Sequence, residues 1–390
     1  SSIALEGERF EGEWRAVDGS RYFQSPYLYK ENGFKEKKHA EELIGMLQAQ
    51  HPLSCRVEKI ERKKENKNPP LLFNLAELQN VCSKLFKISP DETLRITQEL
   101  YEKKLVTYPR TDARVLSSAV AKEIYKNISG LRRYPAIDNA AEEILQMGSY
   151  KSIAKTRYVN DKQITDHYAI IPTGQGLGAL RSLPELNRKI YQVIVRRFLS
   201  IFYSAAVYQK YAVEIEVKGE HFFASFKVLK EAGYLKVAEI PKKKKDTAGE
   251  SVGRTNRLEP GIDGNDAENP AREADGTDSS QPKVIDASHP EFIQMLEQLK
   301  KGMKVSLDDL QIKEGETSPP KRYTSGSMIL AMENAGQLIE DEELRAQIKS
   351  CGIGTSATRA EIIKKLCNIK YLALNKKTQV ITPTLLGEMI

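Results

Sequence analysis

The stretch KKLVTYPRTDARVLSS, residues 103–118, surrounds Tyr108 with Pro109, Arg110 and Asp112. Pro109 fixes its own φ and favours extended backbone at the residues before it. Side chains two positions apart in extended backbone share one face, so we expect the Arg110 guanidinium beside the Tyr108 hydroxyl. A guanidinium there can hold a phosphate through two hydrogen bonds while a phenol oxygen attacks it. The same residues also fit a turn tyrosine near a surface Arg–Asp pair, so this stretch alone leaves both interpretations open.

The length and composition describe a multidomain protein of ordinary polarity. With 390 residues, of which 40% are hydrophobic, we expect two or three domains and no membrane-spanning helix. The net charge of +7 permits binding to phosphate backbones without proving it. The four cysteines and five histidines show no metal-ligand spacing, so we expect no zinc site and a reducing cytoplasm. The opening SSIALEGERFEGEW lacks an initiator methionine and a signal peptide, which predicts a cut fragment.

Two kinds of periodicity divide the chain. Strand-like alternation occurs at residues 3–17, 55–61, 211–228 and 304–313, with a hairpin predicted over 211–228. Helical periodicity dominates residues 69–205, where Ser89, Pro90 and Glu92 predict a helix start with a capping box. We therefore expect an α+β multidomain fold in which a strand-rich domain is interrupted by an inserted helical domain.

Two later segments have distinct compositions. Residues 241–284 are rich in Gly, Asp, Asn, Glu and Pro, which predicts a mobile loop. Its lysine run, Lys242–Lys245, fits a solvated loop end better than a DNA contact. Residues 316–390 predict two helices followed by a β hairpin, the parts of a winged-helix module or simply of a small α+β subdomain.

Two further stretches could bind phosphate. DHYAIIPTG, residues 166–174, contains His167, whose imidazole can donate to a phosphate oxygen or serve a structural role. GIGTSATRAEII, residues 352–363, is a glycine turn leading into a helix, and helix N-termini bind phosphates through free N–H groups. The predicted phosphate contacts of this turn are Gly354, Thr355, Ser356 and Thr358. Thr358 could instead form a capping box with Glu361.

Together, TYPRTDARVLS, DHYAIIPT, GIGTSATRAEII and the segment from Pro69 to Glu102 resemble the type IA DNA topoisomerases, in particular the topoisomerase III-like branch. The resemblance covers nearly the whole chain except residues 241–284. It implies an arch domain at residues 1–68 and 206–315 and a helical tyrosine domain at 69–205. Residues 316–390 are then part of a helical, winged-helix-like DNA-binding domain. The family's toprim domain, whose acidic cluster binds magnesium, has no counterpart here, so we expect no metal site in this fragment.

The resemblance also implies the chemistry. Tyr108 would attack a backbone phosphate of single-stranded DNA and form a 5′-phosphotyrosine without ATP, and Arg110 would stabilise charge on that phosphate. His167, the 352–358 turn and the basic pair Arg196 and Arg197 would contact other phosphates. Asp112 would orient Arg110 or the local turn. Magnesium would bind the missing toprim domain, so we expect a monomeric cytoplasmic fragment that is inactive alone.

Two other classes of DNA-binding protein share part of this pattern. A tyrosine recombinase also forms a phosphotyrosine, but it places an Arg–His–Arg set before the tyrosine, whereas His167 follows Tyr108. A winged-helix DNA-binding regulator built on residues 316–390 leaves the helical insertion and the Tyr–Pro–Arg turn without a role. A topoisomerase fragment should prefer single-stranded DNA, whereas a regulator should prefer a specific duplex.

Overall fold

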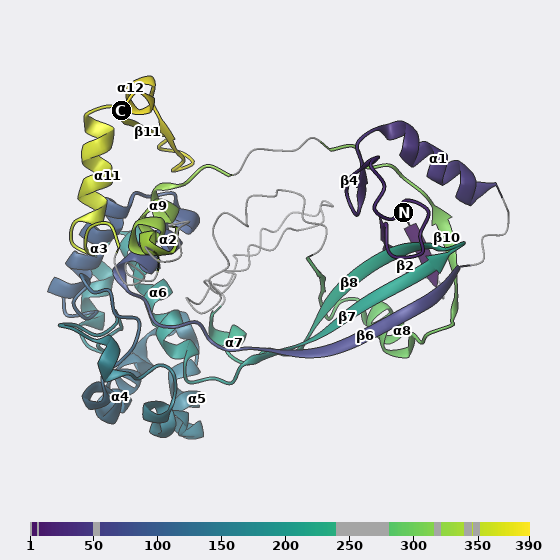
Figure 1. Ribbon diagram of the computed structural model, residues 1–390. Helices are drawn as coiled ribbons and strands as arrows, with labels where there is room; N and C mark the ends of the chain where they lie inside the picture. Colours follow the sequence, from purple (N-terminus) through teal and green to yellow (C-terminus); the bar gives the residue numbers. More distant parts are fainter. Residues whose placement is uncertain are drawn as a thin grey trace. The chain divides into compact units, whose positions relative to one another are not determined.

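The computed structural model describes residues 2–5, 8–49, 55–238, 281–315, 321–338, 345 and 352–390. These residues form two compact units, each with a hydrophobic core of its own (Figure 1). The first unit contains the described residues up to Lys67, Ala206–Ala232 and residues 281–315. The second contains Asn68–Ala205, residues 233–238 and the described residues from 321 onward.

The first unit is built on an eight-stranded sheet. Seven strands follow the order β2-β1-β10-β6-β7-β8-β3, and β9 pairs in parallel with β8. The strands of the sheet are β1 (Ser2–Leu5), β2 (Glu8–Glu11), β3 (Glu13–Arg15), β6 (Cys55–Lys67), β7 (Ala206–Val217), β8 (Glu220–Glu231), β9 (Lys283–Ile285) and β10 (Lys304–Asp309). The small hairpin of β4 (Leu28–Lys30) and β5 (Gly33–Phe34) and the helices α1 (Lys37–Gln48) and α8 (Pro290–Gln298) complete the unit.

The β7–β8 hairpin confirms the strand pattern predicted over residues 211–228. Val213, Ile215 and Val217 are buried on β7, and alternate residues of β8 from Phe222 to Val228 are buried opposite them. The strands extend beyond the apolar pattern because β6 pairs with β7 along its whole length, including its charged half. Charge pairing supports that half, since Glu65 lies 3.0 Å from Lys210 on the neighbouring strand.

One part of the predicted mobile loop is ordered. Residues 283 and 284 belong to β9, which pairs with Lys227 and its neighbours on β8, so the loop prediction was wrong at that end. The sequence pattern missed β9 because a three-residue strand is too short to show periodicity. Residues 241–280, including Lys242–Lys245, lie outside the described residues.

The second unit is mostly helical. Its main helices are α2 (Leu75–Phe86), α3 (Pro90–Glu102), α4 (Ser118–Gly130), α5 (Ala140–Met147), α6 (Glu185–Ser200) and α7 (Leu235–Ala238). Its 3₁₀ helices are η1 (Leu131–Arg133), η2 (Pro135–Ile137), η3 (Ser149–Lys155), η4 (Asp161–Gln163), η5 (Leu177–Ser182) and η6 (Ala335–Leu338). The helix α7 lies in this unit, although the sequence assigned residues 233–238 to the strand-rich domain.

The start of α3 matches its prediction in part. The Ser89 hydroxyl accepts a hydrogen bond from the backbone N–H of Glu92 at 3.1 Å, as an N-cap residue does. The carboxylate of Glu92 does not complete the predicted capping box. It instead accepts two hydrogen bonds from the Arg95 guanidinium, at 2.7 and 3.0 Å, because a charged partner one turn away competes with the backbone N–H.

The C-terminal elements appear in the predicted order of helix, helix and hairpin. They are α9 (Ser325–Glu333), α11 (Arg359–Asn368), β11 (Leu372–Leu374), β12 (Ile381–Pro383) and α12 (Leu385–Glu388). The helix α9 packs closely on α2, where a Cβ at Gly326 would lie 2.8 Å from the Cα of Asn80. These elements therefore share one compact unit with the helices that precede them. None of the helices in the described ranges is long and apolar enough to cross a membrane.

Candidate active site

The segment before Tyr108 is held against residues 169–173. Val106 forms a β bridge with Pro172, and the Thr107 N–H donates to the carbonyl of Ile171 at 3.0 Å. The Thr107 hydroxyl donates to the carbonyl of Ala169 and accepts from the N–H of Ile171, each at 3.0 Å. This threonine fixes the backbone directly before Tyr108 and brings two of the predicted motifs together.

The segment after Tyr108 bends. The Thr111 N–H donates to the carbonyl of Pro109 at 3.0 Å, which makes a tight turn centred on Arg110. The Thr111 hydroxyl donates to the carbonyl of His167 at 2.9 Å, so the turn is tied to the same second motif. The predicted strand that would place Tyr108 and Arg110 on one face is therefore not formed. Arg110 is exposed, and its guanidinium makes no hydrogen bond or ion pair within the described ranges.

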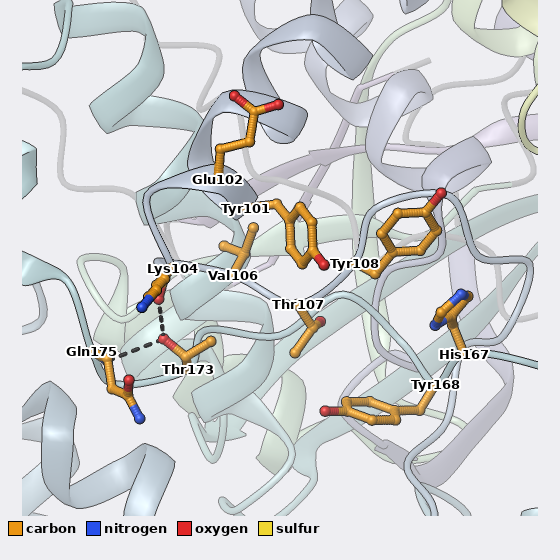
Figure 2. A pocket seen from close by; sticks show the side chains of 10 residues that line it. All are labelled: Tyr101, Glu102, Lys104, Val106, Thr107, Tyr108, His167, Tyr168, Thr173 and Gln175. Atoms are coloured by element: carbon orange, nitrogen blue, oxygen red, sulfur yellow. Dashed lines mark hydrogen bonds between the residues drawn. The ribbon is translucent and has the colours of Figure 1, made fainter.

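The Tyr108 ring is half-buried between two other rings (Figure 2). Its centroid lies 4.4 Å from that of His167, with the planes tilted by 42°. Tyr101 packs against it edge-on, with centroids 5.4 Å apart and an interplanar angle of 79°. In Figure 2 the Tyr108 hydroxyl points away from both neighbours. The rings of Tyr101 and His167 thus hold the Tyr108 ring in place, and neither covers its hydroxyl oxygen.

A pocket of about 530 Å³ opens beside Tyr108. Four rings line it, those of Tyr101, Tyr108, His167 and Tyr168 (Figure 2). Polar side chains, including Lys104, Thr173 and Gln175, line its other part. The pocket lies entirely within the second unit.

Arg359 connects the glycine turn to the tyrosine segment. Its guanidinium is 5% exposed and donates to the carboxylate of Asp112 at 3.0 Å and to the carbonyls of Ile353 and Gly354 at 3.2 and 3.3 Å. Asp112 was predicted to orient Arg110 or the local turn. Its pairing with Arg110 is corrected, because its carboxylate pairs with the buried Arg359, and its role in the turn stays a prediction. Arg359 lies within the motif GIGTSATRAEII, but no role was predicted for it from the sequence. The signal it offered was a charged residue at a helix start that must be paired if buried.

A buried carboxyl group lies behind this pair. Glu333, at the end of α9, accepts a hydrogen bond from the Asn74 amide at 2.8 Å and lies 3.8 Å from the Arg359 guanidinium. The same Asn74 amide donates to the backbone carbonyl of Asp112 at 3.2 Å. Burial raises the pKa of Glu333 to about 7, with Arg359 opposing the rise. Glu333 and Asn74 were missed because their burial depends on α9 packing on α2.

Residues 352–363 form the predicted glycine turn leading into a helix. Gly354 has φ +68°, and a Cβ there would lie 2.9 Å from the Ile362 side chain. The Thr358 hydroxyl accepts from the Thr355 N–H at 2.9 Å and makes no side-chain cap to α11, so the capping-box alternative is not formed. Gly354, Thr355 and Thr358 are exposed and Ser356 is half-buried, which leaves the turn accessible to a ligand.

The basic pair on α6 faces inward instead. Arg196 is 4% exposed, and its guanidinium donates to the carbonyls of Val237 at 2.8 Å and Ala136 at 2.6 Å. Arg197 donates to the carbonyl of Leu71 at 2.9 Å and lies 3.7 Å from Glu77. The phosphate contacts predicted for both arginines are corrected, because the C-terminal half of α6 is buried and both guanidinium groups bind backbone carbonyls.

No group of three or more His, Cys, Asp or Glu side chains is arranged to hold a metal ion among the residues that the structure describes. The described residues therefore do not fit a magnesium site built from three such side chains.

Comparisons with known proteins show which family this chain resembles. A family model described as DNA topoisomerase matches residues 13–269 and 277–390. The chain is 32% identical to DNA topoisomerase 3 of Bacillus licheniformis over 345 residues, which covers 87% of this chain and 41% of that protein. It is 31% identical to DNA topoisomerase 3 of Bacillus subtilis over 379 residues, which covers 96% and 45%. The chain thus spans less than half the length of these relatives.

A structural comparison gives the same picture of the fold. The full-length topoisomerase I from Thermotoga maritima superimposes with a TM-score of 0.56 at 20% sequence identity. The match covers 99% of this chain and 49% of that one. At this identity the likeness concerns the fold alone.

Proposed function

Because this chain belongs to the type IA DNA topoisomerase family, we propose that it carries the nucleophile of an enzyme that breaks and rejoins one strand of DNA. The observation that carries this proposal is the position of Tyr108. Its ring is fixed beside His167, and its segment is joined through Asp112 and Arg359 to the glycine turn. A tyrosine that only filled the core would not need an exposed arginine two residues later and, around it, two segments whose donors could bind phosphate.

The proposed step is an in-line exchange at phosphorus. The Tyr108 oxygen attacks a backbone phosphate of single-stranded DNA and forms a bond to its phosphorus, which stays on the new 5′ end. The bond from phosphorus to the 3′ oxygen breaks, the phenol proton leaves, and the 3′ oxygen takes up a proton to become a hydroxyl. The phosphodiester is conserved as a 5′-phosphotyrosine, so the reverse exchange reseals the strand without ATP.

The chain's own residues supply charge and positioning for this step. Arg110 is exposed two residues after the nucleophile and can pair with the non-bridging phosphate oxygens, where negative charge gathers in the transition state. His167 can donate to a neighbouring phosphate oxygen. The turn of Gly354, Thr355, Ser356 and Thr358 offers hydroxyl and N–H donors to a further phosphate.

The proposal assigns other functions to the part of the relatives that this chain does not cover. The acid that protonates the leaving 3′ oxygen and the ligands of a magnesium ion would lie there. We accordingly expect this chain alone to bind DNA as a monomer and to be inactive in cleavage. The proposed location is the cytoplasm, where bacterial DNA is found.

The decisive experiment combines the chain with the acidic N-terminal domain that the proposal requires, in one polypeptide or in trans. A labelled single-stranded oligonucleotide is incubated with the assembled protein and run on a denaturing gel. We expect a covalent adduct with the native protein and none with Tyr108→Phe, which keeps the ring and removes the oxygen. An adduct that persists in Tyr108→Phe would show that another residue is the nucleophile. As the matched control, Tyr125→Phe changes an exposed tyrosine of α4 outside the site and should leave the adduct unchanged.

A further inference from the structure

We propose that the pocket beside Tyr108 binds one nucleobase of single-stranded DNA, stacked on the rings of Tyr101 and Tyr168, next to the phosphate that Tyr108 attacks. This inference rests on the proposed function and adds a binding subsite to it. The pocket volume of about 530 Å³ lies within the range of about 300–1,000 Å³ that is usual for small-molecule sites.

The aromatic walls are the first observation. Tyr101 ends α3 with 38% of its surface exposed, and Tyr168 is half-buried directly after His167. Figure 2 shows these two rings on opposite sides of Thr107, both at the pocket. Every nucleobase has a flat π surface, and proteins that hold single strands stack successive bases on such exposed rings. Burial raises the pKa of Tyr168, so its hydroxyl keeps its proton and can donate to a base.

The polar end of the pocket is suited to a base edge. The Thr173 hydroxyl donates to the carbonyl of Lys104 at 2.6 Å and accepts from the Gln175 N–H at 3.0 Å, which fixes the backbone there (Figure 2). Within the described ranges, the Gln175 amide and the Lys104 ammonium make no hydrogen bond or ion pair. An amide carries both donors and an acceptor, as a base edge requires.

One cation, Lys104, stands among the residues that line the pocket. Glu102 also lines it, but its carboxylate accepts a hydrogen bond from the Gln98 amide at 3.3 Å and points away from the other labelled side chains in Figure 2. Lys104 can pair with the phosphate attached to that nucleotide, outside the stacked position.

The backbone of the pocket is formed before any ligand arrives. Lys104 has φ +60°, a left-handed conformation that a lysine rarely adopts and that persists where surrounding contacts determine it. A Cβ at Gly176 would lie 2.6 Å from the carbonyl of Lys103, so only glycine lets these two turns meet. A preformed pocket loses less conformational freedom on binding than one that must be assembled.

The test compares two single strands of equal length and charge, an oligothymidylate and the same backbone without bases. Affinity of the full chain for each is measured by fluorescence anisotropy at one salt concentration. We expect the strand with bases to bind more tightly, and Tyr101→Ala or Tyr168→Ala to weaken its binding by about 5- to 150-fold. The same variants should bind the abasic strand as the native chain does.

Two control variants and one alternative test variant separate stacking from folding defects. Tyr168→Phe retains the ring and should retain the preference for bases, which separates stacking from folding defects at this half-buried position. Tyr101→Ala changes a more exposed side chain and serves if Tyr168→Ala fails to fold. Tyr125→Ala removes a tyrosine of α4 that is 46% exposed and does not line the pocket, and it should change neither affinity.

Two results would overturn the inference while leaving the proposed function intact. One is equal binding of both strands by the native chain. The other is a base preference that survives in Tyr101→Ala and Tyr168→Ala, which would place the stacked bases elsewhere. Absence of any single-strand binding would refute the proposed function itself and the subsite with it.

Discussion

The burial of Glu333 predicts a specific dependence of stability on pH. Its pKa lies at about 7 in the folded chain rather than at the ordinary 4.5, chiefly because burial disfavours the carboxylate. Between these two values the folded state holds a proton that the unfolded state has released, so this group makes stability fall as pH rises. A pKa difference of one is worth about 1.4 kcal/mol, so ionising Glu333 costs the folded chain on the order of 3 kcal/mol. The cost is fully present above about pH 7 and is relieved below about pH 4.5.

The substitution Glu333→Gln removes this titration and keeps an oxygen that can accept from Asn74. The free energy of unfolding is measured by urea denaturation, followed by circular dichroism, at about pH 5 and about pH 8. We expect the variant to gain stability relative to the native chain as pH rises, by an amount on the order of 3 kcal/mol over the whole range. Glu361→Gln, at an exposed position of α11, is the matched control and should show no such trend. If the difference between native chain and Glu333→Gln is the same at both pH values, the carboxyl group is not held protonated by burial and the reasoning fails.

Further predictions concern DNA binding, catalysis and the glycine turn. Binding of single-stranded DNA should weaken steeply as salt rises, because phosphate contacts release counterions, and a titration at two salt concentrations measures this. Arg110→Lys in the assembled enzyme should reduce adduct formation strongly, since an ammonium cannot reproduce the two-pronged grip of a guanidinium, and the gel assay quantifies the loss. Thr358→Ala should weaken DNA binding by on the order of 1 kcal/mol, seen as a change in Kd with adduct formation at saturating DNA preserved. Gly354→Ala should lower the free energy of unfolding by at least about 1 kcal/mol, seen as a lower urea midpoint, because φ +68° and the contact with Ile362 both disfavour a side chain.

The elements that could be predicted from the sequence are those whose cause is local. The β7–β8 hairpin follows from alternate burial of short apolar runs, and the start of α3 follows from Ser89 and Pro90. The strand β6 continues to Lys67 because β7 lies beside it, and no periodicity in its charged half indicates that neighbour. The prediction for Arg196 failed for the same reason, because a neighbour distant in sequence determines its surroundings. A basic side chain is usually exposed to solvent, but Arg196 is buried on α6 and donates to the carbonyls of Val237 and Ala136.

In the candidate site, too, the local motif could be predicted from the sequence and the contacts between distant segments could not. The motif around Tyr108 could be found because its residue types are unusual at that spacing, and its resemblance to a family supplied the chemistry. The contacts that hold Tyr108 could not be found, since Thr107, His167 and Arg359 are brought together only by the packing of separate segments. Asp112 shows the consequence: it is two residues from Arg110 in sequence, yet it pairs with an arginine 247 residues away. A buried guanidinium needs a carboxylate more than an exposed one does, because water already solvates the exposed one. The electrostatic demand of Arg359 therefore determines what Asp112 does, and it leaves Arg110 available for a phosphate.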